Sequence, residues 1–144
     1  MKKLLLVNGA NLNRMHKRAP AFYDSGTRLE DIIHATRKHA ASRGFELDDF
    51  QSNHEGAIVD KLQEADGAYD GVLINPGPFT QYSHAIRATL ASLPIPTVEV
   101  HLVNLFKSGE PSVTGKGATC VICGLGKDCY LLGVDAIALA LDAG

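Results

Sequence analysis

The stretch KLLLVNGA, residues 3–10, decides the fold class because an apolar run meets a polar turn within it. The run over residues 3–7 has no polar interruption after Lys3, which is typical of a strand that is buried on both faces of a sheet. Asn8 and Gly9 follow it, and both residue types favour turns. We therefore predict a buried strand over residues 3–7.

Apolar strands and amphipathic helices alternate along the rest of the chain. This alternation predicts an α/β fold in which helices cover both faces of a parallel sheet. Five strands predict a flavodoxin-like three-layer sandwich with strand order 2-1-3-4-5, built as a single domain over residues 1–144. The remaining strands are predicted over residues 45–50, 71–75, 97–100 and 118–124, and the helices over residues 28–44, 55–65, 83–93 and 127–143.

The composition is that of a globular protein without an excess of charge. Of its 144 residues 45% are hydrophobic, and the net charge is −2 at pH 7. This balance argues against a nucleic-acid or anionic-membrane partner, since both need a clustered basic face. No apolar run approaches the roughly 20 residues that span a bilayer, and residues 8–14 end the apolar start too early for a signal peptide. We expect a cytoplasmic protein.

Three cysteines, Cys120, Cys123 and Cys129, lie near the end of the chain. An odd number in an intracellular-type chain does not indicate a disulfide framework. Cys120 and Cys123 have the spacing of a zinc or redox motif, but no second pair accompanies them and they lie in a predicted buried strand. We expect buried structural thiols and no metal site.

Amide, hydroxyl and imidazole side chains follow the predicted strands. Ligands of open α/β sheets bind outside the carboxyl ends of the strands, so these side chains are candidate site residues. Each one alone is as readily a cap or turn residue, but a purely structural role for the whole set is much less expected. The set includes Asn8, Asn11, Asn13, Ser52, Asn53, His54, Asn75, His101 and Asn104.

The connection over residues 8–27 is far longer than the usual two to six residues of α/β units. It carries Arg14, Lys17 and Arg18 ahead of Tyr23. A guanidinium beside a phenol favours the phenolate and lowers its pKa, so a tyrosinate base on a closing lid is one interpretation. A surface tyrosine near solvated cations is the other, and spacing alone leaves both open.

Glu99 and His101 form a second candidate pair at the end of a predicted strand. Residues two apart in a strand point to the same face, so Glu99 can orient His101 or hold it protonated as a general acid. A structural histidine that is satisfied by a neighbouring carboxylate fits the same spacing.

Several motifs together resemble the type II 3-dehydroquinate dehydratases, also called type II dehydroquinases. They occur in the family's order along nearly the whole chain. The segments are NGANLN (8–13), RAPAFY (18–23), QSNHEG (51–56), INPG (74–77), EVHLVN (99–104) and VICGLG (121–126).

The resemblance implies a hydro-lyase of the shikimate pathway and aromatic amino acid biosynthesis. Its reaction is the trans elimination of water from 3-dehydroquinate through an enolate, without metal or cofactor. Tyr23 is then the base that removes a proton α to the ketone, and Arg18 holds it as phenolate. Asn11 binds the water that stabilises the enolate. His101, supported by Glu99, protonates the departing hydroxyl.

The resemblance also implies how the substrate is held and how the subunits assemble. Asn75 and the backbone amides near Leu102 and Val103 bind the substrate carboxylate. Gln81 occupies a substrate-binding position, and Arg14, Lys107 or Lys116 are candidate replacements for an arginine of the family pattern. The family typically forms a dodecamer of four trimers, which implies a homo-oligomer.

Some positions depart from the family pattern, although the proton-transfer residues do not. Gln81 stands in place of a histidine, Ala88 in place of an aspartate and Val103 in place of a serine. The segment over residues 106–112 is shorter and lacks arginine. Because lost polar contacts change specificity strongly, three interpretations stay open. The substrate is 3-dehydroquinate or a related cyclic hydroxyketone carboxylate of a specialised pathway, or the chain is a non-catalytic homologue that binds a small carboxylate or acts as a scaffold.

Overall fold

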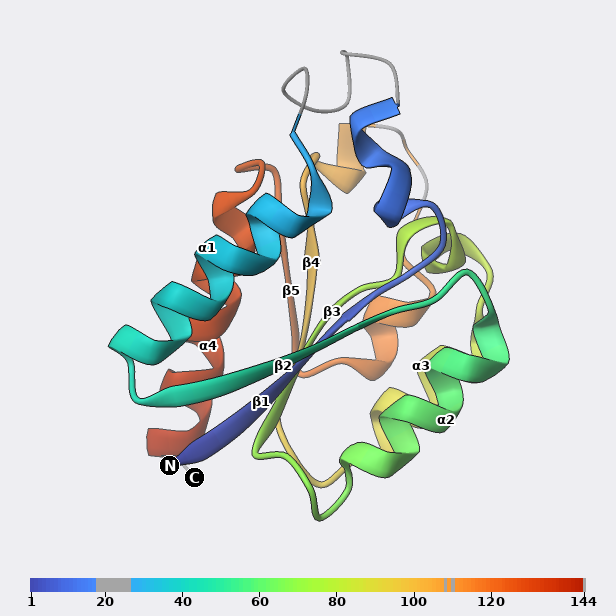
Figure 1. The fold of residues 1–144 in the computed structure, drawn as a ribbon. Helices are drawn as coiled ribbons and strands as arrows, with labels where there is room; N and C mark the ends of the chain where they lie inside the picture. Colours follow the sequence, from blue (N-terminus) through green and yellow to red (C-terminus); the bar gives the residue numbers. More distant parts are fainter. Residues whose placement is uncertain (18–26, 108, 110, 144) are drawn as a thin grey trace.

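The computed structural model describes residues 1–17, 27–107, 109 and 111–143, and Figure 1 shows its ribbon. One parallel sheet has the order β2-β1-β3-β4-β5, which confirms the predicted fold class and strand order. No helix in these ranges is long and apolar enough to cross a membrane. The strands are β1 (Lys2–Asn8), β2 (Phe45–Gln51), β3 (Gly71–Asn75), β4 (Thr97–His101) and β5 (Cys120–Cys123), and the α-helices are α1 (Leu29–Ser42), α2 (Glu55–Ala65), α3 (His84–Ser92) and α4 (Asp128–Ala143).

Helices cover both faces of the sheet. Figure 1 shows α1 and α4 on one face and α2 and α3 on the other. Leu4 and Leu6 of β1 belong to the core under α1 and α4, whereas Leu5 and Val7 belong to the core under α2 and α3. All four side chains are fully buried. Because both faces of β1 are covered, residues 4–7 are all apolar and do not alternate with polar residues.

The strand β5 is less buried than its sequence predicts. It forms an edge of the sheet, and Val121 is 40% exposed. Cys120 and Cys123 are half-buried, and Cys129 of α4 is buried, so the expectation of buried thiols is correct for Cys129 alone. Burial raises the pKa of the Cys120 and Cys129 thiols, which makes both less reactive.

The connection after β1 begins as packed structure. Residues Leu12–Lys17 form a 3-10 helix, η1, in which Leu12 and Met15 are each 1% exposed and join the core under α1 and α4. Two apolar side chains therefore anchor this part of the connection against the core. The rest of the predicted lid, residues 18–26, lies outside the described residues.

Candidate active site

The strand β4 carries Glu99 and His101 to the carboxyl end of the sheet, on one face as predicted. His101 Nε2 lies 2.8 Å from Glu99 Oε2. Both side chains are buried, with Glu99 0% and His101 6% exposed. Glu99 is in register with Ile74, which belongs to the core under α2 and α3. The pair therefore lies on the α2–α3 side of the sheet, at the edge where ligands of this fold class bind.

Two hydroxyl groups that the sequence prediction missed also contact Glu99. Ser112 Oγ donates to Oε2 at 2.6 Å, and Thr114 Oγ1 donates to Oε1. Thr114 begins the 3-10 helix η4 (Thr114–Gly117), which packs against α3. The segment that leads into η4 has neither strand nor helix periodicity, so no sequence pattern placed it beside β4.

Asn75, at the end of β3, belongs to a second buried network. Its Nδ2 donates to Tyr130 Oη at 3.0 Å, and its Oδ1 accepts from the Gly77 N–H at 3.1 Å. Tyr130 of α4 in turn donates to Asn8 Oδ1 at 2.6 Å. Asn8 Nδ2 is buried without a hydrogen-bond partner among the described residues.

This second network lies on the opposite face of the sheet from His101. Tyr130 is a member of the core under α1 and α4, so Asn75 points away from the α2–α3 side. Within the described ranges, no hydrogen bond joins Asn75 to His101 or Glu99. The structure thus brings the predicted catalytic residues His101 and Glu99 together. It places Asn75, which is predicted to bind the substrate carboxylate, in a separate network at the same end of the sheet.

Asn11 is held through its backbone. Its φ of +67° lies in the left-handed region, which Asn tolerates better than most residues. Its N–H donates to Asn53 Oδ1 at 3.0 Å, and the same oxygen accepts from Gln51 Nε2 at 3.1 Å. Asn11 itself is exposed, so its side chain is accessible to a ligand at the sheet edge.

The backbone after β4 presents two amides. Leu102 is 8% and Val103 41% exposed. The Leu102 carbonyl accepts from the Gly126 N–H at 2.9 Å. In the part of the chain that the structure covers, neither the Leu102 nor the Val103 N–H donates a hydrogen bond. Both amides therefore have donor capacity for an anionic ligand.

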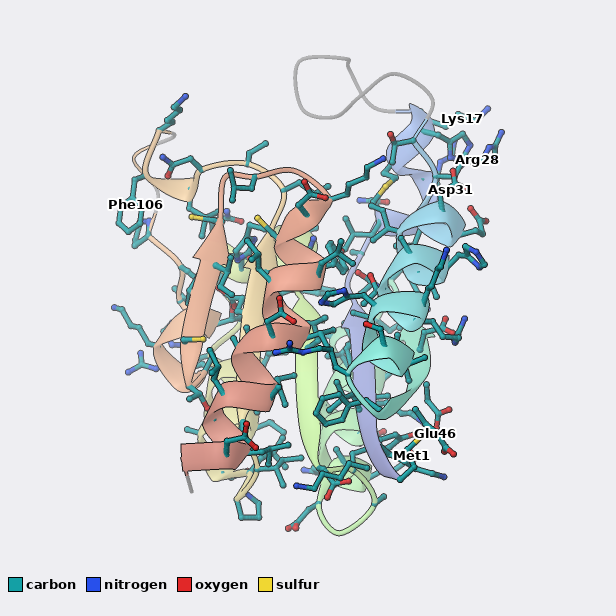
Figure 2. The ribbon with its side chains drawn as sticks, turned by 90° about the vertical axis from the view of Figure 1, so that its left-hand side faces the viewer. Met1, Lys17, Arg28, Asp31, Glu46 and Phe106 are labelled. Carbon is teal, nitrogen blue, oxygen red and sulfur yellow. The ribbon has the colours of Figure 1, made fainter. Side chains whose placement is uncertain are left out.

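Basic side chains gather at this end of the molecule. Arg14 and Lys17 lie in η1 and are exposed. Figure 2 shows Lys17 and Arg28 beyond the carboxyl ends of the strands, while Met1 and Glu46 lie at the opposite end. Arg14 and Lys17 can attract a small anion, while Asp31 lies beside Arg28 at the same end (Figure 2).

The other predicted site residues are less constrained. Gln81 ends the 3-10 helix η2 (Gly77–Gln81) and is exposed. The expected base, Tyr23, and its cation, Arg18, lie outside the described residues. The part of the candidate site that the structure describes therefore contains His101, Glu99 and Asn75. The described residues hold no group of three or more His, Cys, Asp or Glu side chains that could bind a metal.

The chain is similar to known enzymes over most of its length. The model of the family "Dehydroquinase class II" matches residues 2–138. The 3-dehydroquinate dehydratase of Bacillus mycoides (strain KBAB4) is 48% identical over 124 residues, which covers 85% of this chain and 82% of that protein. The enzyme of the same name from Bacillus cytotoxicus is 46% identical over 123 residues, with the same shares of both chains.

A solved structure agrees with this relationship. The crystal structure of a type II dehydroquinase from Butyrivibrio crossotus DSM 2876 matches with a TM-score of 0.89 at 37% identity. The match covers 95% of this chain and 97% of that one. Sequence and fold therefore agree on one conclusion: the chain belongs to the class II dehydroquinase family.

Proposed function

We propose that this protein is a 3-dehydroquinate dehydratase, a carbon–oxygen lyase that eliminates water from 3-dehydroquinate. The observation that carries the proposal is the buried Glu99–His101 pair, with 2.8 Å between Oε2 and Nε2, in a chain whose relatives at 46% and 48% identity bear that name. The exposed cations Arg14 and Lys17 support a small carboxylate as substrate, as do the Leu102 and Val103 N–H groups, which have no acceptor among the described residues.

The elimination needs a base for the proton α to the ketone and an acid for the leaving hydroxyl. We assign the acid to His101, because a buried carboxylate holds its ring in place. Tyr23 is the proposed base, and Arg18 favours its phenolate by charge. Asn11 holds a water against the enolate oxygen. The roles of Tyr23 and Arg18 rest on the segment RAPAFY and its resemblance to the family pattern.

The substrate carboxylate is proposed to bind between Asn75 and the N–H groups of Leu102 and Val103. A side-chain amide nitrogen carries two hydrogens. Asn75 Nδ2 donates one of them to Tyr130 Oη, 3.0 Å away. The second hydrogen is the one offered to the ligand. Gln81 and Arg14, both exposed, are the proposed contacts to the ring hydroxyls.

Mixing the purified protein with 3-dehydroquinate tests this function, because the product is a conjugated enone with strong ultraviolet absorbance. We expect catalysed enone formation, and Tyr23→Phe should reduce kcat by about 10²-fold or more. Tyr69→Phe is the matched control, since Tyr69 precedes β3 at the opposite end of that strand from Asn75. A wild-type rate equal to the uncatalysed rate would sink the dehydratase assignment.

A related cyclic hydroxyketone carboxylate is the second candidate substrate. It is favoured by Val103, which presents a 41% exposed apolar side chain where the family pattern has a serine. Weak turnover of 3-dehydroquinate, with stronger turnover of an analogue that lacks one ring hydroxyl, would support this substrate. Binding of both compounds without turnover of either would instead support the non-catalytic homologue.

The proposal includes a homo-oligomer built from trimers, up to a dodecamer, and keeps a single domain per chain and a cytoplasmic location. Exposed apolar side chains such as Phe106, at 87%, and Leu139, at 66%, support an assembly that covers them. Mass photometry distinguishes a 15.4 kDa monomer from a particle twelve times heavier. A stable monomer would contradict this part of the proposal.

A further inference from the structure

The inference concerns the two hydroxyl groups on Glu99, and its catalytic part rests on the proposed function. Ser112 Oγ accepts the Gly115 N–H at 2.8 Å and lies 2.6 Å from Glu99 Oε2. A hydroxyl has one hydrogen. Because Ser112 Oγ accepts the Gly115 N–H through a lone pair, its own hydrogen is directed to the Glu99 carboxylate. Thr114, which is 0% exposed, donates to the other oxygen, Oε1. Each oxygen of Glu99 therefore accepts from a hydroxyl.

These donors settle which nitrogen of His101 carries a hydrogen. A carboxylate whose two oxygens both accept from hydroxyls acts toward its other neighbours as an acceptor. The imidazole nitrogen at 2.8 Å from Oε2 must then donate, so the hydrogen is on Nε2. Nδ1 is then the nitrogen that takes up a second proton and, from the imidazolium, donates it to a ligand at the sheet edge.

The backbone of η4 packs closely against Glu99 and α3, with no space for a side chain at its glycines. A Cβ on Gly115 would lie 2.8 Å from Glu99 Oε2 and 2.9 Å from Ser112 Oγ. A Cβ on Gly117 would lie 2.1 Å from the Arg87 carbonyl oxygen in α3. Two glycines thus allow η4 to approach β4 and α3 at a distance that brings both hydroxyls onto the carboxylate.

We propose that Ser112 and Thr114 are positioning residues that fix Glu99 as an acceptor and thereby set His101 with hydrogen on Nε2 and with Nδ1 toward the reacting group. The alternative is that the two hydroxyls only satisfy a buried carboxylate. That role changes stability but leaves the tautomer of His101 and the kcat of the folded enzyme as they are.

Thr114→Val and Thr114→Ser form the matched pair that tests the proposal. Valine keeps the shape and loses the hydroxyl, whereas serine keeps the hydroxyl. The ring nitrogens are observed by ¹⁵N NMR of histidine-labelled protein, and His101→Asn identifies the signals of His101 among the six histidines. At a pH where His101 is neutral, we expect the Nε2–H tautomer in wild type and Thr114→Ser, and a mixture of tautomers in Thr114→Val.

Kinetics on the same proteins test the catalytic part. We expect Thr114→Val to lower kcat about 10-fold with KM nearly unchanged, and Thr114→Ser to restore kcat to within about 2-fold. If Thr114→Val folds poorly, Ser112→Ala with Ser112→Thr as its control replaces the pair. An Nδ1–H tautomer in wild type, or a Thr114→Val protein with wild-type spectrum and wild-type kcat, would overturn the proposal. Absence of wild-type turnover would overturn the dehydratase function alone, because the NMR result does not depend on substrate.

Discussion

Glu99 and His101 lie on the same face of β4, and 2.8 Å separates Glu99 Oε2 from His101 Nε2. Because both side chains are buried, the contact is protected from water, and a hydrogen bond to a buried carboxylate is stronger than one at the surface. The residues that complete the arrangement, Ser112 and Thr114, come from the segment between β4 and β5.

Replacing Glu99 with glutamine tests the value of the negative charge. Glu99→Gln keeps the shape but places an amide N–H₂ among three donors, so kcat should fall about 10²-fold. Steady-state absorbance assays measure the change. Glu46→Gln is the control, since Glu46 is an exposed residue at the opposite end of the molecule (Figure 2); equal losses in both variants would show that the charge at Glu99 has no special role.

Removing the Tyr130 hydroxyl should destabilise the fold. Tyr130→Phe deprives Asn8 Oδ1 of a donor and Asn75 Nδ2 of an acceptor, and buried polar groups without partners cost about 1–3 kcal/mol. Urea denaturation gives the free energy of unfolding. Tyr82→Phe, which removes a hydroxyl from a 57% exposed side chain, should change this free energy by less than about 0.5 kcal/mol.

Replacing Gly115 and Gly56 with alanine should change the free energy of unfolding in opposite directions. Gly115→Ala forces a Cβ to 2.8 Å from Glu99 Oε2, and such overpacking costs about 1–3 kcal/mol of unfolding free energy. Gly56→Ala in α2 meets no atom within 4 Å, so it should stabilise the helix by about 0.5–1 kcal/mol. Thermal unfolding monitored by circular dichroism compares them, and a Gly115→Ala protein as stable as wild type would contradict the close fit of η4.

Tyr69 gives a pH-dependent contribution to stability. Burial and the hydrogen bond to the Asp48 carboxylate, 2.7 Å long, raise the pKa of Tyr69 to about 12. The raised pKa means that the folded state holds this proton more tightly than the unfolded chain. The contribution is therefore fully present below about pH 10 and is lost as the pH rises through about 12.

Urea titrations of wild type and Tyr69→Phe at pH 9 and pH 11.5 measure this contribution. The difference in unfolding free energy should shrink at the higher pH, and a constant difference would contradict the expected linkage. Asp48→Asn is the companion variant, because it removes the carboxylate and should lower the pKa of Tyr69 in an ultraviolet titration.

The sequence predicts the sheet well because each interior strand has a local pattern of apolar residues. The run over residues 4–7 is apolar since both of its faces are buried, and the spacing of Glu99 and His101 predicts their contact through the geometry of a strand. The edge strand β5 carries similar apolar residues, so its sequence resembles that of a central strand although Val121 is 40% exposed.

Contacts between distant, irregular segments leave no such pattern. Asn8 and Tyr130 are 122 residues apart, and nothing near either residue indicates the other. Ser112 precedes a short 3-10 helix and Thr114 begins it. The approach of this helix to Glu99 depends on two glycines that could equally belong to any turn. Met15 has polar neighbours in the sequence, yet its own side chain is buried.

The two hydrogen-bonded networks lie on opposite faces of one sheet, with His101 and Glu99 on one side and Asn75 and Tyr130 on the other. Substitutions that share no partner are usually additive in free energy, so Thr114→Val and Tyr130→Phe combined should cost the sum of their separate effects. On the proposed roles of Asn75 and His101, substitutions in one network should change substrate affinity and those in the other proton transfer, each with little effect on the other.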